Sequence, residues 1–315
     1  MAMNVGVIGL GAMGLGMANS LRRAGHEVFA YDVRAGVAKL FAADGGRACE
    51  TLGELGAACA VVVSAVVNAV QTEAVLFGSN TAAGGGSSST TGCAAHMRPG
   101  SVFVMCSTVD PHWSAAMETR LEALGLAYLD APMSGGAAKA AQGEITLMTA
   151  GRPEVYARCD EVLTAMAGKI YKLGDRAGAG SKVKIINQLL AGVHIAAAAE
   201  AMALGLREGV DAAALYDVIT HSAGNSWMFE NRIPAVVNND YTATSAVDIF
   251  VKDLGLVNDM ARASKFPLPL ASTAHQMFMQ ASTAGYAREQ DCAVIKIFPG
   301  ITLPGGKSDD TKKSG

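Results

Sequence analysis

Hydrophobic positions in the first half of the chain fall into short runs rich in β-branched residues, separated by stretches long enough for helices. Such runs predict strands, which we place at Val5–Leu10, Glu27–Asp32, Ala60–Val66, Val102–Cys106, Ala127–Asp130 and Ile145–Ala150. The stretch Met13–Ala24 has helical spacing. Strands that alternate with helices predict an α/β domain whose parallel, doubly wound sheet is covered by helices on both faces.

The pattern changes after about Gly178, because apolar residues then recur at helical spacing and no convincing strand follows. We predict an all-helical second domain, entered through a long alanine-rich helix at Ser181–Glu208. Asp211 is a suitable N-cap for the helix that comes next. The remaining predicted helical segments are Ala212–Thr220, Val247–Ala263, Pro269–Ala284 and a short last turn at Asp291–Ile297.

Two segments show no periodicity. Residues 79–95 are rich in glycine and serine, which predicts a flexible surface loop without a chemical role. Residues 304–315 are polar, and we expect them to form a flexible tail. The chain is therefore expected to have domains at residues 1–178 and 179–303, followed by this tail.

Composition excludes several classes of protein. Hydrophobic residues make up 50% and charged residues 17% of the 315 positions, which is enough apolar material for a buried core. The net charge of −3 implies no basic face, so nucleic acid is not an expected partner. None of the six cysteines forms a CxxC pair, which favours buried free thiols over a disulfide framework or a metal site.

No signal-peptide pattern opens the sequence, and its most apolar stretch, Leu189–Leu206, contains His194 and Glu200. This stretch predicts a buried helix and not a membrane span. We therefore expect a cytoplasmic protein that binds no membrane.

A glycine-rich segment follows the first predicted strand and opens the first helix. It consists of Gly9, Leu10, Gly11, Ala12, Met13 and Gly14, in the spacing GxGxxG. In this context the first glycine permits a tight turn, the second lets a pyrophosphate approach the backbone, and the third allows close helix–strand packing. The alternative is a glycine turn that binds nothing. The segment predicts a Rossmann-type dinucleotide-binding domain over residues 1–178.

The choice of cofactor depends on Asp32, which ends the next predicted strand. A carboxylate at this place accepts hydrogen bonds from ribose hydroxyls and repels a 2′-phosphate, which favours NAD. Arg34 leaves some tolerance for NADP. Val67 and Thr108 follow later strands, where a doubly wound sheet binds its ligands. Thr108 is a candidate partner for the nicotinamide end.

Three further motifs carry a family resemblance. They are DAPMSGG at residues 130–136, GAGSKVKIIN at residues 178–187 and KDL at residues 252–254. With the glycine loop, their order and spacing resemble the β-hydroxyacid dehydrogenase family, of the 3-hydroxyisobutyrate dehydrogenase type, over about residues 4–303. The resemblance implies that Ser134, Gly135 and Gly136 bind substrate, that Lys184 is catalytic, and that Lys252 reaches the cofactor.

The residues themselves fit these roles. Ser134–Gly136 offers a hydroxyl and successive backbone N–H groups, which suit a carboxylate, although a plain turn would use the same residues. Lys184, Asn187 and Gln188 share one helix face among apolar neighbours. Partial desolvation is expected to lower the pKa of the lysine toward neutrality, so that it takes up the hydroxyl proton as hydride leaves. Asn187 would orient the lysine or the substrate, and Asn187 and Gln188 are both substrate-binding candidates.

Several alternatives remain at this point. Lys182 lies on another helix face and should be exposed, as an ordinary helical lysine is. The family often has a second asparagine where this chain has Gln188. Lys252 follows Asp248 by four residues, so a surface ion pair is its other interpretation. No metal is needed, and the histidines do not cluster.

The segment Thr220–Arg232 lies between predicted helices and mixes polar with aromatic residues. It resembles the pocket segment of the branch that oxidises L-threonate to a 2-oxo-tetronate, with Asn225 and Trp227 as substrate-binding candidates. The segment alternatively only caps two helices. Other substrates left open are 3-hydroxyisobutyrate and tartronate semialdehyde, and a non-catalytic NAD-binding module is the alternative of another class. The family precedent implies a homodimer or homotetramer.

Overall fold

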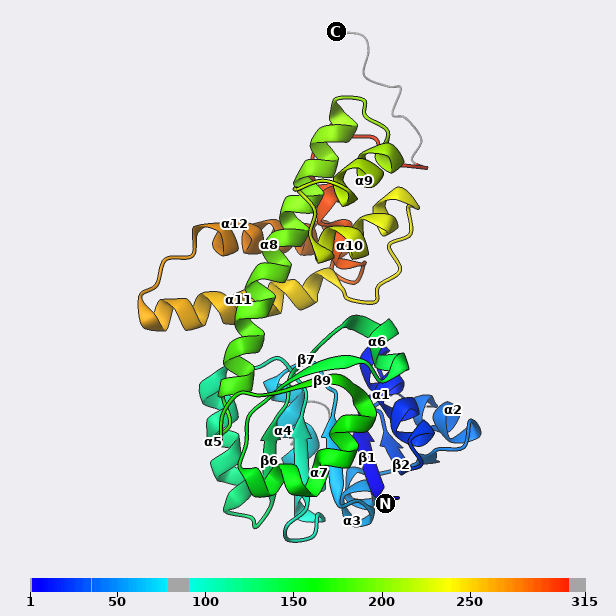
Figure 1. Ribbon diagram of the computed structural model, residues 1–315, viewed down its shortest axis with the longest axis vertical. Coiled ribbons are helices and arrows are strands. Elements are labelled where there is room, and N and C mark those ends of the chain that lie inside the picture. Colours follow the sequence, from blue (N-terminus) through cyan, green and yellow to red (C-terminus); the bar gives the residue numbers. More distant parts are fainter. Residues whose placement is uncertain (1, 35, 79–90, 306–315) are drawn as a thin grey trace, which may run out of the picture. The chain divides into compact units, whose positions relative to one another are not determined.

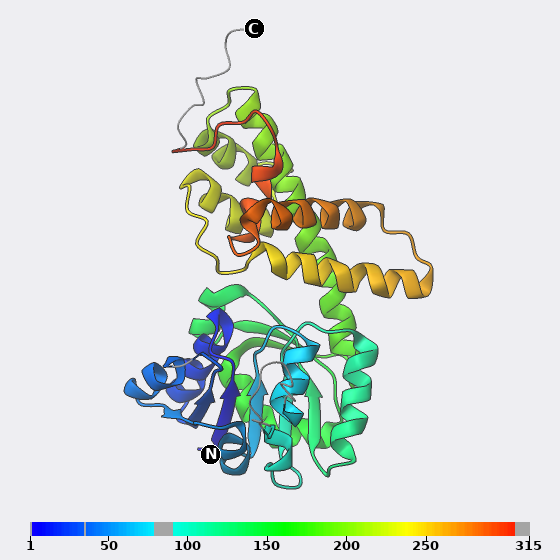
Figure 2. The same ribbon diagram turned by 180° about the vertical axis from the view of Figure 1, so that it is seen from behind.

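The computed structural model describes residues 2–34, 36–78 and 91–305, and Figures 1 and 2 show it from opposite sides. It divides into two compact units, Met1–Lys184 and Ile185–Gly315. The division falls within the long helix α8 (Ala179–Arg207), whereas the predicted domain boundary, after residue 178, lies where that helix begins.

Unit 1 is built on a six-stranded parallel sheet with the strand order β3-β2-β1-β4-β5-β6. Its strands are β1 (Asn4–Ile8), β2 (Glu27–Tyr31), β3 (Arg47–Ala48), β4 (Val61–Ser64), β5 (Val102–Met105) and β6 (Ala127–Asp130). This is the Rossmann order, in which the chain reverses direction across the sheet between β1 and β4. The prediction of a parallel, doubly wound sheet is confirmed, although β3, with two residues, was too short to recognise.

Helices cover both faces of this sheet. They are α1 (Ala12–Arg23), α2 (Val37–Ala43), α3 (Leu52–Ala58), α4 (Ala69–Phe77), α5 (Pro111–Glu122) and α7 (Pro153–Met166), whereas α6 (Gly136–Gln142) packs on α1. Successive residues of one strand enter different cores: Val61 and Val63 of β4 pack in one hydrophobic cluster, and Val62 packs in another. Burial on both faces explains why the strands are continuous apolar runs.

The predicted strand Ile145–Ala150 does not belong to the parallel sheet. It forms β8 (Ile145–Thr149) in a separate three-stranded sheet, between β7 (Met133–Ser134) and β9 (Ala167–Lys172). β7 pairs with it antiparallel. Only the short helix α6 separates β7 from β8, and a parallel crossover needs a longer connection. The inclusion of this strand in the main sheet was therefore wrong.

The predicted flexible loop at 79–95 lies mostly outside the described residues. Its described end is not a flexible surface loop, because Cys93–Ala95 forms a 3-10 helix in which Cys93 and Ala94 are buried. Gly92 has no side chain, and an added Cβ would lie 2.2 Å from the backbone of Leu76 in α4. Small residues therefore pack this segment onto the domain. Residues 306–315 of the predicted tail are likewise outside the described part of the chain.

Unit 2 consists of helices, and no strand follows Lys172 in the described residues. After α8 come α9 (Ala212–Thr220), α10 (Trp227–Val237), α11 (Val247–Ser264), α12 (Pro269–Ala281), a π-helical turn at Ser282–Tyr286 and a 3-10 helix at Asp291–Ile297. The all-helical prediction is confirmed. One error is α10, which begins inside the segment predicted to lie between helices, because Ser226 caps it through the N–H of Phe229.

The long helix α8 is apolar enough and long enough to cross a membrane by length and composition alone, and 39% of its most apolar window is buried in the structure. Ile195, Ala199 and Met202 lie in the core of unit 2. Ile186, Leu190 and Leu204 are exposed. The expectation of a buried helix holds for one side of α8 only.

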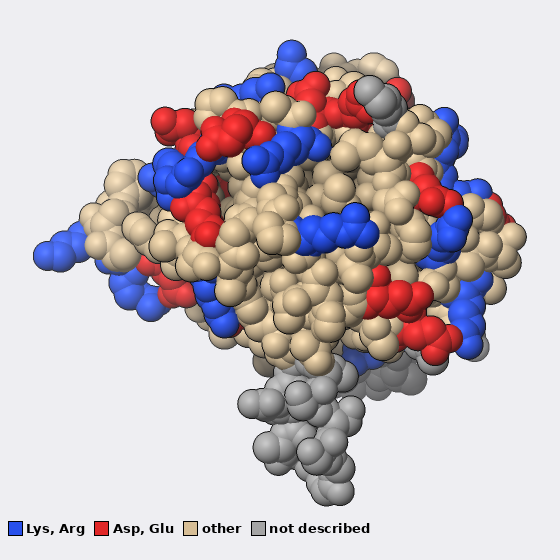
Figure 3. All heavy atoms as spheres, turned by 90° about the horizontal axis from the view of Figure 1, so that it is seen from below, with Lys and Arg blue, Asp and Glu red and all other residues tan. Residues whose placement is uncertain are grey.

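All six cysteines are free and buried, as predicted. Burial raises the pKa of the Cys106 thiol to about 12, so it stays protonated at neutral pH. On the face of the molecule drawn in Figure 3, basic and acidic side chains are interspersed among uncharged ones. That face, as far as it is described, carries no field of a single sign.

Candidate active site

The glycine loop lies between β1 and α1, at the point where the strand order reverses. Gly9 has a φ of +88°, which disfavours a side chain, and a Cβ on Gly14 would lie 1.8 Å from the carbonyl oxygen of Gly9. Both positions therefore require glycine. A Cβ on Gly11 would meet no protein atom within 4 Å, so the surface there is open.

Gly11 also precedes the first turn of α1 and has no side chain to cap it. Ala12 is exposed, Met13 is half-buried and Leu10 is buried. The N–H groups of the first helical turn are left for an outside acceptor, and the helix dipole favours an anion there. This local structure fits a pyrophosphate.

Asp32 follows β2 and is held on the same edge. Its Oδ2 accepts from the Leu10 N–H at 2.8 Å, and its Oδ1 accepts from the Arg34 N–H at 2.8 Å. The guanidinium of Arg34 adds a bond to each oxygen. The hydrogen bond from the Arg34 side chain holds the pKa of Asp32 down at about 2, so this carboxylate is ionised at neutral pH.

The ends of two later strands carry the remaining cofactor-binding candidates of unit 1, at the carboxyl end of the parallel sheet. Val67, after β4, is 43% exposed and its N–H donates to the Gln71 side chain. Thr108, after β5, is half-buried. Because β1, β2, β4 and β5 are parallel, all the cofactor-binding candidates before residue 110 lie along one edge of the sheet. The residues present fit a dinucleotide cofactor.

The substrate-loop candidates lie in the same unit, beside the start of α8. Ser134 ends β7, Gly135 is half-buried and Gly136 is exposed. Both glycines have positive φ, +129° and +76°. The Met148 N–H in β8 donates to the carbonyl of Pro132, which fixes the loop's first residues. A Cβ on Gly180 of α8 would lie 2.3 Å from the Met148 carbonyl, so α8 begins in direct contact with this small sheet.

Lys184 lies on α8, one turn after Ser181. It is a buried lysine, 7% exposed, whereas Lys182 is exposed. The two lysines therefore differ as predicted. A buried lysine is rare without a specific partner or function, and it has the proton-transfer chemistry that a hydroxyl oxidation requires.

The amides that follow Lys184 on α8 belong to unit 2, where they join a polar chain. Asn187 donates to the side-chain oxygen of Gln188 at 3.0 Å, and Gln188 donates to Asp253 at 2.5 Å. The Lys252 ammonium pairs with the other oxygen of Asp253, also at 2.5 Å. The extra methylene of Gln188 thus lets it reach a carboxylate on α11. The ion pair that the structure shows for Lys252 is thus with the buried Asp253, whereas the alternative interpretation had named Asp248.

Asn225 and Trp227 lie at the connection between α9 and α10. The amide nitrogen of Asn225 donates to the Thr220 carbonyl at 3.1 Å and to Glu230 at 2.5 Å, so it stabilises the turn. Trp227 is the first residue of α10 and is 49% exposed. Helix capping therefore accounts for part of this segment, and the substrate-binding role of the two residues stays a prediction.

Family models match both parts of the chain. The NAD binding domain of 6-phosphogluconate dehydrogenase matches residues 4–174, and the NAD-binding domain of NADP-dependent 3-hydroxyisobutyrate dehydrogenase matches residues 178–298. An L-threonate dehydrogenase from Cupriavidus necator is 63% identical over 97% of this chain and 99% of its own length. The chain belongs to the β-hydroxyacid dehydrogenase family.

Other members of the family agree in length and fold. An L-threonate dehydrogenase from Escherichia coli is 51% identical, covering 97% of this chain and 98% of the relative. A crystal structure of a 3-hydroxyisobutyrate dehydrogenase from Salmonella typhimurium is 50% identical, covers 94% of this chain and 100% of that one, and has a TM-score of 0.87. The chain is thus an NAD-dependent hydroxy-acid dehydrogenase, the class of enzyme that its motifs predicted.

Three polar residues of these motifs were given no role by the sequence. Asp130 and Ser181 bond to each other in unit 1, and Asp253 joins Gln188 to Lys252 in unit 2. Asp253 stands directly after Lys252 in the KDL motif, and this position is the sequence signal that could have identified it. Asp130 stands 51 positions before Ser181, and no local pattern pairs them.

Proposed function

We propose that this dehydrogenase oxidises L-threonate to 2-oxo-tetronate (2-dehydro-L-erythronate) with NAD, and that Lys184 is its general acid/base. The observation that carries the mechanism is the burial of Lys184, which is 7% exposed and lies one turn after Ser181 near the start of α8. The substrate is inferred from the similarity to L-threonate dehydrogenases at 63% and 51% identity.

The reaction divides its work among residues of this chain. Ser134 and the N–H groups of Gly135 and Gly136 would hold the substrate carboxylate, with no side chain on the glycines to obstruct it. Neutral Lys184 would take the proton from the substrate hydroxyl, and in the reverse direction it would return that proton to the alkoxide. A dinucleotide held by the glycine loop and Asp32 would supply the hydride acceptor for this oxidation. Asn187, one turn after Lys184, would orient the amine or the substrate.

A panel of acids tests the substrate. At fixed NAD, kcat/KM is measured for L-threonate, D-threonate, D-glycerate and 3-hydroxyisobutyrate. We expect L-threonate to exceed each of the others by at least about tenfold, which is about 1.4 kcal/mol of transition-state binding. The similarity to the Salmonella enzyme makes 3-hydroxyisobutyrate the second candidate. Equal or faster turnover of that acid would refute the L-threonate assignment.

We also propose that the protein is a homodimer or homotetramer and acts in the cytoplasm. The exposed Ile186, Leu190 and Leu204 lie on one side of α8, and monomers rarely expose such rows. Six buried free thiols suit a reducing compartment. Sedimentation should give a multiple of 32.3 kDa, and a single species at that mass would contradict the oligomer.

A further inference from the structure

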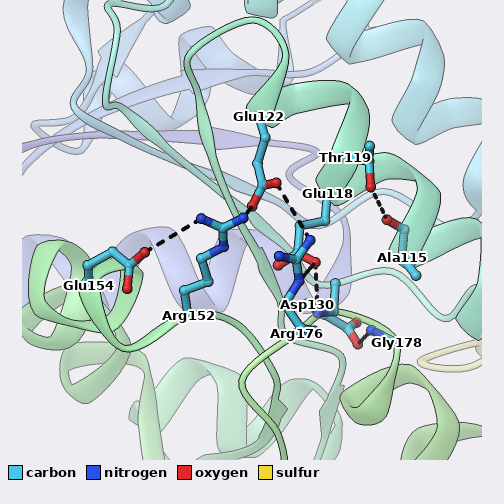
Figure 4. A network of polar contacts seen from close by, with 10 residues as sticks. Ala115, Glu118, Thr119, Glu122, Asp130, Arg152, Glu154, Arg176 and Gly178 are labelled. Atoms are coloured by element: carbon cyan, nitrogen blue, oxygen red, sulfur yellow. Dashed lines mark hydrogen bonds and ion pairs between the residues drawn. The ribbon is translucent and has the colours of Figure 1, made fainter.

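Two buried carboxylates accept hydrogen bonds from the segment in which α8 begins (Figure 4). Asp130, at the end of β6, is fully buried, and Glu118, on α5, is 2% exposed. Glu118 accepts from Arg176 at 2.9 Å and from the Ala177 N–H at 3.3 Å, just before the helix. Asp130 accepts from residues at the helix start itself.

The bonds to Asp130 come from the first turn of α8. Its Oδ2 accepts from the N–H of Gly178 at 2.8 Å and of Ser181 at 2.9 Å. Its Oδ1 accepts from the Ser181 hydroxyl at 2.6 Å. A carboxylate that accepts the free N–H groups of a first turn acts as an N-cap and also complements the helix dipole. Here the cap is supplied by a strand of the sheet and not by the residue before the helix.

The same residue is tied to β8 by its backbone. The Asp130 N–H donates to the Ala150 carbonyl at 3.1 Å, and the Ala150 N–H donates back at 2.8 Å. Gly178 and Gly180 let the helix start approach closely, since a Cβ on Gly180 would lie 3.2 Å from Asp130 Oδ2. Asp130 therefore links β6, the end of β8 and the start of α8, and the Ser134–Gly136 loop begins four residues after it.

Such a carboxylate stays in place only through its bonds. Burial raises the pKa of Asp130, and the bonds from Ser181 and Gly178 act in the opposite direction. Removing a partner from a fully buried carboxylate leaves an unsatisfied polar group, which is unfavourable. The two hydrogen bonds that Asp130 accepts from Ser181 therefore fix the first turn of α8.

We propose that Asp130, acting through Ser181, is a positioning residue that holds Lys184 in register with the Ser134–Gly136 loop. Ser181 is three residues before Lys184, so both lie on one side of the helix, one turn apart. A shift of this turn moves the amine relative to the loop that follows Asp130. The inference rests on the proposed function of Lys184, and it assigns Asp130 no contact with the reacting atoms.

The test is a double-mutant cycle. Asp130→Asn and Ser181→Ala are each made in the native enzyme and in Lys184→Ala, and kcat and KM are measured with L-threonate and NAD. We expect Asp130→Asn to lower kcat by about 10–100-fold, because a small misplacement of the base has an effect of that size. The KM for NAD should stay within about twofold of the native value, since the glycine loop is untouched. In the Lys184→Ala enzyme either change should lower the residual kcat by less than about twofold.

Ser181→Ala removes only the hydrogen bond from the Ser181 hydroxyl to Asp130. If Asp130→Asn does not fold, the double-mutant cycle is completed with Ser181→Ala and Lys184→Ala. Its expected loss of kcat is smaller, about fivefold. Glu118→Gln is the matched control. It replaces a second buried carboxylate, which accepts hydrogen bonds from Arg176 and Ala177, just before α8 begins. It should lower Tm but leave kcat close to the native value.

Three results would overturn the inference. One is an equal loss of kcat on Asp130→Asn with and without Lys184, which would show a general structural role. Another is a loss of kcat in Glu118→Gln as large as in Asp130→Asn at the same Tm. The third is normal kcat in Asp130→Asn while Lys184→Ala is inactive, which would leave the proposed function intact. A fully active Lys184→Ala would instead refute both.

Discussion

The guanidinium of Arg34 donates to both carboxylate oxygens of Asp32, from Nε to Oδ1 at 2.9 Å and from Nη2 to Oδ2 at 2.9 Å. Two backbone N–H groups, from Leu10 and Arg34, occupy the remaining lone pairs. A ribose diol must therefore displace Arg34 to reach Asp32. Arg34 is 59% exposed, so it is able to swing away, and its charge is available to a 2′-phosphate.

The first prediction concerns cofactor choice. Arg34→Ala should leave or improve kcat/KM with NAD, because Asp32 is then open to the ribose, and should lower kcat/KM with NADP. We expect the ratio of kcat/KM with NAD to kcat/KM with NADP to rise about two- to fivefold, since one exposed and screened charge contact contributes about 0.5–1 kcal/mol. Steady-state kinetics with each cofactor measure this ratio. An unchanged ratio would show that Arg34 takes no part in selection.

The second prediction concerns pH. The folded-state pKa of Asp32 is about 2, so the carboxylate is ionised throughout the neutral range and loses its charge only as pH falls toward that value. The NAD/NADP ratio of the native enzyme should therefore stay constant between about pH 7.5 and pH 9, where the 2′-phosphate of NADP, whose second pKa is about 6, is also fully ionised. Asp32→Asn should lower the ratio at every pH in that range. A ratio that changes strongly within that range would contradict an ionised carboxylate at Asp32.

The third prediction separates folding from cofactor binding within the glycine loop. Gly14→Ala places a Cβ 1.8 Å from a carbonyl oxygen, whereas Gly11→Ala meets no protein atom. Gly14→Ala should lower the free energy of unfolding by at least about 1–3 kcal/mol. Gly11→Ala should keep the native Tm but weaken NAD binding, since its methyl group occupies the place for the pyrophosphate.

Thermal unfolding and NAD titration by fluorescence test this pair together. Native NAD affinity in Gly11→Ala would show that the pyrophosphate does not approach the loop there. A native Tm in Gly14→Ala would show that the close packing of α1 on β1 is not required.

The fourth prediction concerns the polar chain of unit 2. Asp253 is 1% exposed and bonds to Gln188 and Lys252. Asp253→Asn removes the charge that pairs with Lys252 and should lower the unfolding free energy by about 3 kcal/mol. Asp259, on the same helix, pairs with Arg262 at the surface, so Asp259→Asn should lower it by less than about 1 kcal/mol. Denaturant unfolding compares the two, and equal effects would contradict the structural importance of Asp253.

The sequence predicted the features that depend on local pattern. The strand runs near Val5 and Val61, the glycine loop before α1 and the helices after Gly178 follow from periodicity and turn residues, and the structure confirms them. The exposure of Lys182 and the burial of Lys184 follow from helix geometry alone. These features need no knowledge of distant contacts.

The features that were missed depend on tertiary contacts. β3 is too short to have a period, and β8 joins a second sheet because the short helix α6 allows an antiparallel partner. The start of α10 depends on a cap by Ser226 within a segment that has a polar composition. Asp130 and Ser181 come together only when β6 and α8 pack, so their bond has no sequence signal.

The central claim is that Lys184 transfers the proton during hydroxy-acid oxidation. The most direct measurement is kcat for L-threonate oxidation by Lys184→Ala, with the dissociation constant for NAD measured on the same preparation and Lys182→Ala as the control. We expect kcat to fall by about 10²–10⁴-fold in Lys184→Ala. NAD binding should stay close to native, and Lys182→Ala should turn over normally. A Lys184→Ala enzyme with native kcat would contradict the account.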